Sequence, residues 1–489
     1  MSVPATGISG LAVYLPPYRV DLRAWCKWTG ADWEKIRKVV GTGFRLVGPD
    51  QSVYTMAANA VLRLIRNYDI DPGRVRYLAL GTESSTDNSA GAVIIKGMVD
   101  SALQAEGRPP LSRHCEVPEF KHACLGGVYG IKNALRFLAT DGEDALAIVV
   151  SADKALYSLG SSGEPTQGAG AVAVLLERDP TIGTLDPAQS GTASDYRGVD
   201  FRKPLINRNG TGASPEFVDI PVFNGKYSTS CYVDEMQRAL EDMYHRRNMD
   251  PIKYLRSLRA VFMHRPYHRM PETGWAMAYL FALAHGDSKD VEELEGYCRQ
   301  ANVPCAEVLD ELRRHKRLAD FAVRDRITEE IFPLSLSVLR AFRHTDAFRE
   351  CVLDRMNLGA TAMLELGNLY TAALPAWLAA GLAEAADNSV ELAGKELLLV
   401  GYGSGDAAEV LPMNLVPGWE RAAHAIDFEA CLSPSVDLSY EQYLELRGQR
   451  PRQEFVPFAP SAEFVVERIG QESADAFQDA GIEYYRYIQ

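Results

Sequence analysis

Short apolar runs alternate with stretches of helical period along the first half of the chain. Apolar residues recur at helical spacing over Ser52–Tyr68, and the following run Val75–Leu80 is rich in β-forming residues. Gly126–Ala139 again has helical period, whereas Ala145–Val150 and Ala169–Leu176 are continuous apolar runs that suit strands buried on both faces. This alternation predicts an α/β fold with a buried sheet.

The second half of the chain repeats the pattern. Arg259–Met263 predicts a strand that ends in a His-rich turn, and Glu396–Val400 predicts a buried strand followed at once by GYGSG. Gly286–Glu350 differs, because it carries many charged residues at helical spacing, and we expect a helical excursion on the surface there. In the polar and aromatic tail we expect helices near Tyr440–Arg447 and Phe464–Ala480.

These patterns divide the chain into three expected parts. Residues 1–188 form a first α/β half, residues 189–430 form a second half with the charged helical insertion 286–350, and residues 431–489 form a C-terminal extension. Gln189–Val218 is rich in Gly, Ser, Asn and Asp, and is the expected linker or long loop between the halves.

Composition and charge narrow the function classes. The 489 residues are 47% hydrophobic and 24% charged, which are globular values. The net charge of −14 disfavours nucleic acid as a partner. The eight cysteines show no CxxC spacing, which is typical of reduced cytosolic thiols. Because no signal-peptide pattern and no bilayer-length apolar stretch is present, we expect a cytoplasmic protein without membrane contact.

Cys124 is the first candidate for chemistry. In HACLGG it stands where a helical pattern begins, so the positive end of the helix dipole is expected to lower its pKa and raise the thiolate fraction. The small neighbours Ala123, Gly126 and Gly127 leave room for a substrate backbone. The alternative is a plain buried cysteine, since free cysteine is often part of a core.

Glu83 and His264 each follow an apolar strand, where loops of an α/β sheet carry function. An apolar pocket would raise the pKa of Glu83 and make it a general base, while the alternative is a surface acid. His264 and His268 have the spacing of a metal pair, but Pro266 opposes a helix between them and no HExxH motif follows. We therefore expect no metal ligand, and an acid/base role or a core position remains open for His264.

Two glycine-rich loops complete the set. Gly163–Val172 (GEPTQGAGAV) and Gly401–Gly405 (GYGSG) match neither a dinucleotide fingerprint nor a P-loop. They suit close backbone approach and amide donors for an oxyanion.

Taken together, these segments resemble the 3-hydroxy-3-methylglutaryl-CoA (HMG-CoA) synthase family of the thiolase superfamily. The resemblance rests on TES at 82–84, HACLGG around Cys124, the GEPTQGAG loop, HRPY at 264–267, GNLYTAAL at 367–374 and GYGSG, in this order, and it runs to about Gly418. It implies an α/β fold, a thiolase-like five-layered αβαβα sandwich from two pseudo-repeated halves with an added helical segment, and a homodimer. It also implies Claisen-type condensation of acetyl-CoA with acetoacetyl-CoA, with coenzyme A thioesters as substrates and no cofactor.

The resemblance further implies roles for individual residues. Cys124 takes the acetyl group as a thioester, Glu83 removes a proton from the acetyl methyl group, and His264 orients and protonates the acetoacetyl oxygen. The implied substrate-binding positions are Tyr157, Ser162, Thr166, Ser228, Arg269, Asn368 and Ser404, and the implied supporting acids are Asp153 and Asp200.

Two departures from the family pattern keep alternatives open. Arg269 and Thr273 stand where the family usually has lysines that meet coenzyme A phosphates. A second interpretation is therefore an HMG synthase-like enzyme of polyketide β-branching, whose acceptor is bound to an acyl carrier protein. A third is a non-catalytic thiolase-fold subunit that bridges partners, which the intact Glu83, Cys124 and His264 disfavour.

Overall fold

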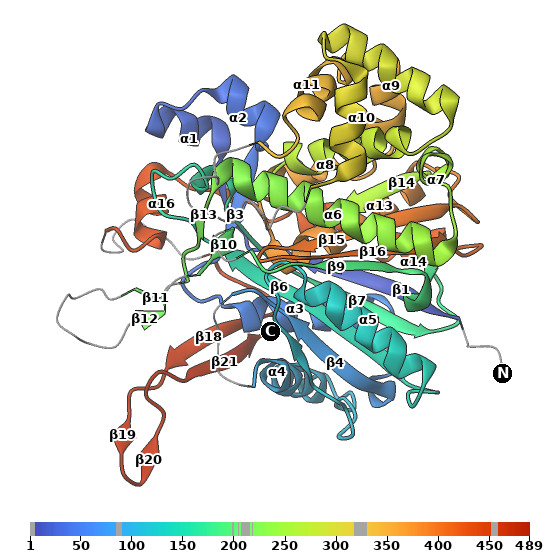
Figure 1. Cartoon of the computed structure of the whole chain (residues 1–489). Coiled ribbons are helices and arrows are strands. Elements are labelled where there is room, and N and C mark those ends of the chain that lie inside the picture. The colour runs from blue at the N-terminus through green and yellow to red at the C-terminus, as the bar shows by residue number, and fades with distance from the viewer. Residues whose placement is uncertain are drawn as a thin grey trace.

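A mixed sheet runs through the molecule (Figure 1). The computed structural model describes residues 5–84, 90–197, 200–203, 205–206, 216–217, 219–316, 330–450 and 458–489. Among these residues, ten strands form one sheet in the order β14-β15-β16-β8-β1-β7-β6-β4-β5, with β9 paired to β16. The strands are β1 (Thr6–Tyr14), β4 (Val75–Gly81), β5 (Glu119–Phe120), β6 (Leu146–Ala155), β7 (Gly168–Arg178), β8 (Gly183–Leu185), β9 (Gly191–Ser194), β14 (Ala260–Met263), β15 (Glu396–Gly403) and β16 (Ala407–Leu415).

Helices cover the sheet in layers. Helices α3 (Val53–Asn67) and α4 (Gly91–Ala105) pack on the outer face of the strands from the first half. Helices α5 (Gly126–Ala139) and α13 (Ala373–Asp387) lie between the strands of both halves, and helices α6 (Gly225–Arg247) and α8 (Arg269–Ala284) cover the strands of the second half. The result is the five-layered αβαβα sandwich that the family resemblance implies.

The central helix α5 ties the two halves together. Leu125 and Val128, at its start, lie against Gly401 of β15, where a Cβ atom would come within 2.6 Å of the Leu125 side chain. Farther along α5, Lys132 forms a buried ion pair of 2.6 Å with Glu409 of β16. Because both contacts reach strands of the second half, α5 fixes the loop before it relative to both halves.

The buried elements expected from the apolar pattern are confirmed. The predicted helix over Ser52–Tyr68 is α3, which begins with a capping box in which Thr55 Oγ1 accepts a 2.8 Å hydrogen bond from the Ser52 amide. The predicted strands are β4, β6, β7, β14 and β15, and β6 is buried along almost its whole length. Such runs form strands because both faces are covered by helices.

The charged segment 286–350 is helical where the structure describes it, and residues 317–329 lie outside the described part. Three of its helices stack on α8 (Figure 1). The apolar side of these helices is buried and contributes Leu294, Val308, Leu312 and Val338 to the core. Charged residues face outward, which explains the composition. The helices are α9 (Ser288–Ala301), α10 (Cys305–Arg314), α11 (Pro333–Phe342) and α12 (Asp346–Phe348).

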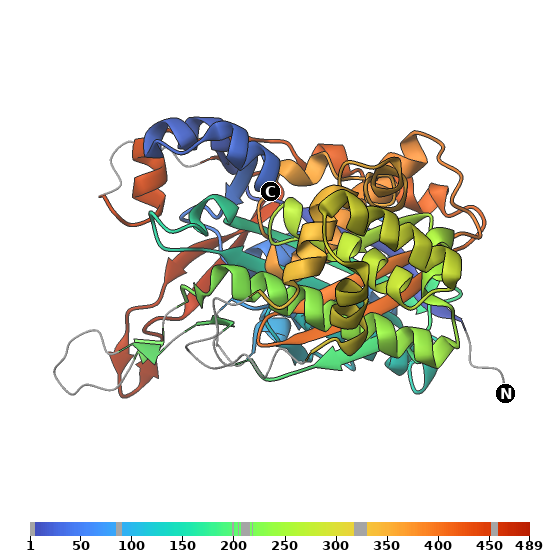
Figure 2. The same cartoon turned by 45° about the horizontal axis from the view of Figure 1, so that its top comes forward.

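The predicted helix over Phe464–Ala480 is wrong. β18 (Glu463–Ile469) pairs antiparallel with β21 (Glu483–Ile488), and β19 (Ser473–Ala474) with β20 (Phe477–Gln478). This hairpin projects from the body of the protein (Figures 1 and 2). Aromatic and β-branched residues on both strands favour this pairing, and Phe464 anchors the base of the hairpin in the core. The predicted helix over Tyr440–Arg447 is confirmed as α16 (Tyr440–Leu446).

The remaining elements are short. The loop expected over Gln189–Val218 contains β9 and the two-residue strands β10, β11 and β12, and part of it lies outside the described residues. In the described part of the chain, no helix has both the length and the apolar character to cross a bilayer. The other elements are α1 (Leu22–Thr29), α2 (Trp33–Val39), α7 (Pro251–Ser257), α14 (Glu420–His424), α15 (Phe428–Cys431), β2 (Tyr18–Asp21), β3 (Gly43–Leu46), β10 (Phe201–Arg202), β11 (Leu205–Ile206), β12 (Glu216–Phe217), β13 (Val222–Phe223) and β17 (Val436–Asp437).

Candidate active site

A cavity of about 610 Å³ gathers most of the predicted site residues. Glu83, Asp153 and Asp200 are buried behind its lining. Arg269 does not line it. The Arg269 side chain is 39% exposed, and its Nε lies 3.9 Å from Glu272. The predicted residues in the lining are Cys124, Tyr157, Ser162, Thr166, Ser228, His264, Asn368 and Ser404.

Cys124 and Glu83 are in direct contact. The Cys124 Sγ donates a 3.0 Å hydrogen bond to Glu83 Oε2, and both side chains are buried. Cys124 lies between β5 and α5, after Ala123, which has a positive φ of 40°. The following glycines serve packing rather than substrate approach, since a Cβ on Gly127 would lie 2.0 Å from Ser151 Oγ.

The charges at this pair place the proton on sulfur. Burial raises the pKa of the Glu83 carboxyl to about 7, against the opposing charge of Lys203. Burial and the nearby Glu83 carboxylate raise the pKa of the Cys124 thiol well above its ordinary value. The expected lowering of the Cys124 pKa by the helix dipole is therefore wrong, because α5 begins only at Gly126 and burial dominates. Near pH 7 the thiol faces a Glu83 carboxyl that is present in both protonated and ionised forms, and the ionised form can take the thiol proton.

Asp153 holds the Glu83 loop in place. Its Oδ1 accepts hydrogen bonds of 2.8 Å from the backbone amides of Glu83 and Ser84, and its Oδ2 accepts one of 2.9 Å from the amide of Thr371. These bonds tie the end of β4 to β6 and to the segment before α13. Asp153 therefore supports the Glu83 loop, and the supporting role in the reaction that the family resemblance implies stays a prediction.

Lys203 and Thr371 are functional candidates that sequence reasoning missed. Lys203 Nζ donates to the Glu83 carbonyl at 2.8 Å and to Asp219 at 2.7 Å, so its charge acts on Glu83. The Thr371 hydroxyl donates to Asp153 at 2.5 Å. Thr371 lies in the motif GNLYTAAL and Lys203 in the segment DFRKP at 200–204, but only their contacts in space reveal what they touch.

His264 lines the cavity as a neutral imidazole. Its backbone is fixed by hydrogen bonds to the Val400 carbonyl, at 2.7 Å, and from the Tyr232 hydroxyl, at 3.0 Å. The ring stacks on Tyr402 at 6.4 Å between centroids. Burial lowers the pKa of His264 to about 3, and among the described residues neither ring nitrogen has a hydrogen-bond partner. The ring is therefore free to donate a hydrogen bond to a ligand.

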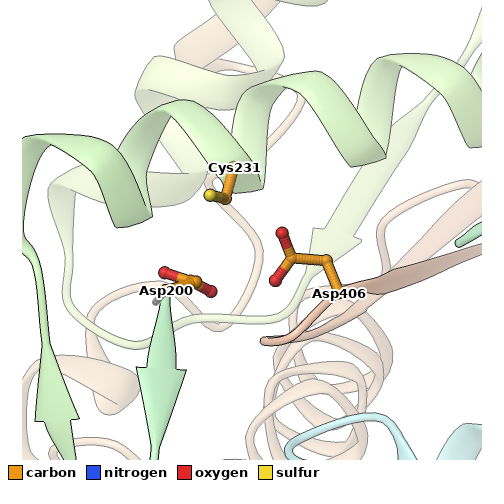
Figure 3. Close-up of side chains that lie close together, drawn as sticks. All are labelled: Asp200, Cys231 and Asp406. Atoms are coloured by element: carbon orange, nitrogen blue, oxygen red, sulfur yellow. The ribbon is translucent and has the colours of Figure 1, made fainter. Parts of the chain in front are cut away.

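Asp200, Asp406 and Cys231 form a buried cluster (Figure 3). The Tyr402 hydroxyl lies 3.2 Å from Asp200 Oδ2 and 3.0 Å from Asp406 Oδ1. Burial and the Asp406 charge raise the pKa of Asp200 to about 8, so Asp200 keeps its proton at neutral pH. Arg197 binds Asp406 Oδ2 at 2.9 Å. The same guanidinium also pairs with Asp234 and Glu235, so one cation serves three carboxylates here.

The GEPTQGAG loop and the GNLYTAAL segment shape another part of the wall. The Asn368 amide donates to the Thr166 carbonyl at 3.0 Å, which joins GNLYTAAL to the GEPTQGAG loop. Gly367 has a φ of 74°, and a Cβ there would lie 1.7 Å from the Gln167 carbonyl oxygen, so only glycine fits. Tyr157 and Tyr370 then pack directly against Cys124.

The fold and the cavity define an α/β enzyme scaffold in which a buried cysteine can carry an acyl group next to a base. Models of the family described as hydroxymethylglutaryl-coenzyme A synthase match residues 3–181 (N terminal) and 345–459 (C terminal). Together these matches span more than half of the chain, which therefore belongs to the HMG-CoA synthase family. His264 and most of the helical excursion lie between the two matched regions.

Individual relatives agree with this assignment. The hydroxymethylglutaryl-CoA synthase of Haloferax volcanii is 26% identical over 94% of this chain and 96% of its own length. That of Enterococcus faecalis is 27% identical over 89% and 90%. The structure of MvaS in complex with 3-hydroxy-3-methylglutaryl coenzyme A has a TM-score of 0.75 at 24% identity, covering 100% of both chains. The curacin pathway HMG synthase in complex with holo donor-ACP gives 0.69 at 19%, covering 99% of this chain and 100% of that one, so the fold is shared.

Proposed function

We propose that this protein is an HMG-CoA synthase-like acyltransferase. It would condense acetyl-CoA, through an acetyl thioester on Cys124, with acetoacetyl-CoA and hydrolyse the product to HMG-CoA and coenzyme A. The observation that carries the proposal is the 3.0 Å contact between Cys124 and Glu83 at a cavity that also exposes His264.

In the first step Glu83 accepts the thiol proton as the Cys124 sulfur attacks the carbonyl of acetyl-CoA. The bond from that carbonyl to the coenzyme A sulfur breaks, and the leaving thiolate takes the proton from Glu83, which is then a carboxylate again. Glu83 suits this role because a base with a pKa near the working pH is the most effective. Asn368 and Ser404 are the proposed polar groups that face the thioester oxygen.

In the second step Glu83 removes a proton from the acetyl methyl group, and the resulting carbanion attacks the ketone carbon of acetoacetyl-CoA. The neutral His264 donates a hydrogen bond that orients the ketone oxygen and passes its proton to that oxygen as the new bond forms. His264 then recovers the proton that Glu83 took from the methyl group, so that the imidazole is neutral and Glu83 is a carboxylate again. Water then cleaves the thioester to Cys124. Coenzyme A thioesters are substrates in this scheme, and no step uses a metal or redox cofactor.

A direct test is mass spectrometry after mixing the protein with acetyl-CoA, with the modified residue located. An acetyl group on Cys124, followed by loss of the acetoacetyl-CoA enolate absorbance when the acceptor is added, supports the proposal. Label on another cysteine, or on none, contradicts it. The non-catalytic bridging subunit would then gain support.

A second candidate is an HMG synthase-like enzyme of polyketide β-branching. Thr273 motivates it, because this residue carries no charge where the family usually has a lysine. Arg343 opposes it, since its guanidinium donates a 2.8 Å hydrogen bond to the Thr273 hydroxyl and so brings a cation to the same place. Condensation only with an acceptor on an acyl carrier protein would select this candidate. In both cases we propose a cytoplasmic homodimer, which sedimentation or light scattering of the purified protein can test.

A further inference from the structure

We propose that Arg447 and Tyr443, at the end of α16, are positioning residues that hold one wall of the acyl pocket and so determine which acyl groups reach Cys124. The C-terminal extension thereby gains a role at the site. The identity of the acyl donors rests on the proposed function, but the positioning itself does not.

Arg447 fixes the backbone of Tyr157. One guanidinium nitrogen of Arg447 donates a 2.6 Å hydrogen bond to the Tyr157 carbonyl, and the other binds Gln167 Oε1. The same Oε1 atom accepts the Tyr157 amide at 3.3 Å. Both polar groups of the Tyr157 backbone are therefore held by the paired side chains of Arg447 and Gln167, of which Arg447 comes from the C-terminal extension.

Tyr443 holds the other end of the same loop. This side chain is 1% exposed, and its hydroxyl donates to Glu164 Oε1 at 2.7 Å and accepts from Gln167 Nε2 at 3.1 Å. Glu164 Oε2 in turn accepts the Gly160 amide at 2.6 Å. The segment from Tyr157 to Gln167, which carries the cavity residues Ser162 and Thr166, thus rests on α16 at several points.

This loop bounds the space in front of the nucleophile. Tyr157 packs with Tyr370 against Cys124, whose residue surface is only 9% exposed. A wall held at both backbone groups discriminates against a donor one methylene longer, because neither the wall nor the cysteine can retreat. Release of the wall is expected to relax this limit, and pocket walls of this kind supply about 10-fold or more between homologous substrates.

Two variants test the proposal. Arg447→Met keeps the aliphatic stem but removes the bonds to Tyr157 and Gln167, and Tyr443→Phe removes only the hydroxyl. Arg63→Met is the matched control, since Arg63 also donates to a buried carbonyl, that of Val13 at 3.0 Å, and pairs with Glu463 in the extension, but does not line the cavity. Thermal unfolding of all three shows whether each is folded and by how much it is destabilised.

The first readout needs no catalysis. Alkylation of Cys124 by iodoacetamide, followed peptide by peptide, is expected to be at least about fivefold faster in Arg447→Met than in Arg63→Met at the same temperature below unfolding, since lost hydrogen bonds to a charged group free the wall. Arg447→Lys, which retains a donor, should restore part of the protection. Equal rates in Arg447→Met and Arg63→Met would overturn the positioning role.

The second readout compares acetyl-CoA with propionyl-CoA as donors to Cys124. The preference for acetyl is expected to fall about fivefold or more in Arg447→Met, and less in Tyr443→Phe, while Arg63→Met keeps it. An unchanged preference in Arg447→Met overturns the specificity role. If the wild-type protein takes no acyl group at all, the proposed function fails, and the alkylation experiment still decides whether Arg447 holds the wall.

Discussion

The Cys124 sulfur donates a 3.0 Å hydrogen bond to the Glu83 carboxylate, although the two residues are 41 positions apart in the chain. The contact exists because the loop after β4 and the loop before α5 meet at one end of the sheet. Asp153 accepts a hydrogen bond from the backbone of the first loop, and α5 packs the second loop against both halves. Acid/base chemistry at sulfur therefore depends on two independent supports.

Removal of the base should separate acylation from condensation. In Glu83→Ala, acetyl-enzyme is expected to form more slowly, by about 100-fold at pH 7, and no condensation product should accumulate. The control is Glu143→Gln, whose carboxylate lies on the surface with 80% of the side chain exposed. Rapid-quench mass spectrometry measures the acyl-enzyme, and condensation at the wild-type rate would remove Glu83 from its assigned role.

The pH profile of acylation should report the same carboxyl. Since burial raises the pKa of Glu83 to about 7, the rate of Cys124 acylation is expected to rise as pH passes through about 7 and Glu83 loses its proton. In Glu83→Ala this limb should disappear, because the pKa of the thiol itself lies far higher. Stopped-flow rates from pH 5.5 to 9 are the measurement, and a limb that survives the substitution belongs to another group.

Loss of the nucleophile should abolish acylation while preserving the fold. Cys124→Ala removes one buried sulfur, for which about 1 to 2 kcal/mol of unfolding free energy is the expected cost. The control is Cys298→Ala, which removes another buried cysteine, located in α9. Acyl label that persists in Cys124→Ala, or that is absent from the Cys124 peptide of the wild-type protein, contradicts the assignment.

His264 should affect the acceptor more than the donor. His264→Ala is expected to leave acetyl-enzyme formation within about threefold of wild type and to lower condensation by about 100-fold, since the hydrogen bond to the ketone oxygen is lost. Because burial lowers the pKa of His264 to about 3, no kinetic step should show a limb near pH 6.5 from this ring. Separate single-turnover assays of each half-reaction test both statements, and an equal loss in both would oppose the role.

The acid pair of Asp200 and Asp406 should make stability depend on pH. Asp200 has its folded-state pKa raised to about 8 by burial and Asp406, while in the unfolded chain its pKa is about 3.9. The folded state thus binds the proton more tightly than the unfolded chain. The contribution of Asp200 to the free energy of unfolding is therefore complete below about pH 4 and is lost as pH rises toward 8. Asp406→Asn removes the repelling charge and should flatten the decline between pH 5 and 9, measured by urea unfolding. A slope unchanged from wild type would contradict the coupling.

Much of the fold is predictable because it depends on local sequence patterns. The strands β4, β6 and β7 are continuous apolar runs, and the capping-box residues Ser52 and Thr55 mark the start of α3. The pattern over Phe464–Ala480 predicts a helix, whereas the structure has the hairpin of β18 and β21. This hairpin is stabilised by cross-strand pairs such as Phe464 with Tyr487. Such pairs join residues too far apart in the sequence for a local pattern to show them.

The motifs of the sequence indicate the side chains that we propose for the chemistry, since Glu83 and His264 stand at strand ends and Cys124 before a helix, and these motifs also identify the family. How these groups behave follows from the folded arrangement. It placed Lys203, Thr371 and Arg447 around them, left Arg269 outside the cavity, and reversed the expected pKa shift of Cys124. The physical reason is that burial and charge act through space, so a titrating group responds to neighbours that the chain brings from distant positions.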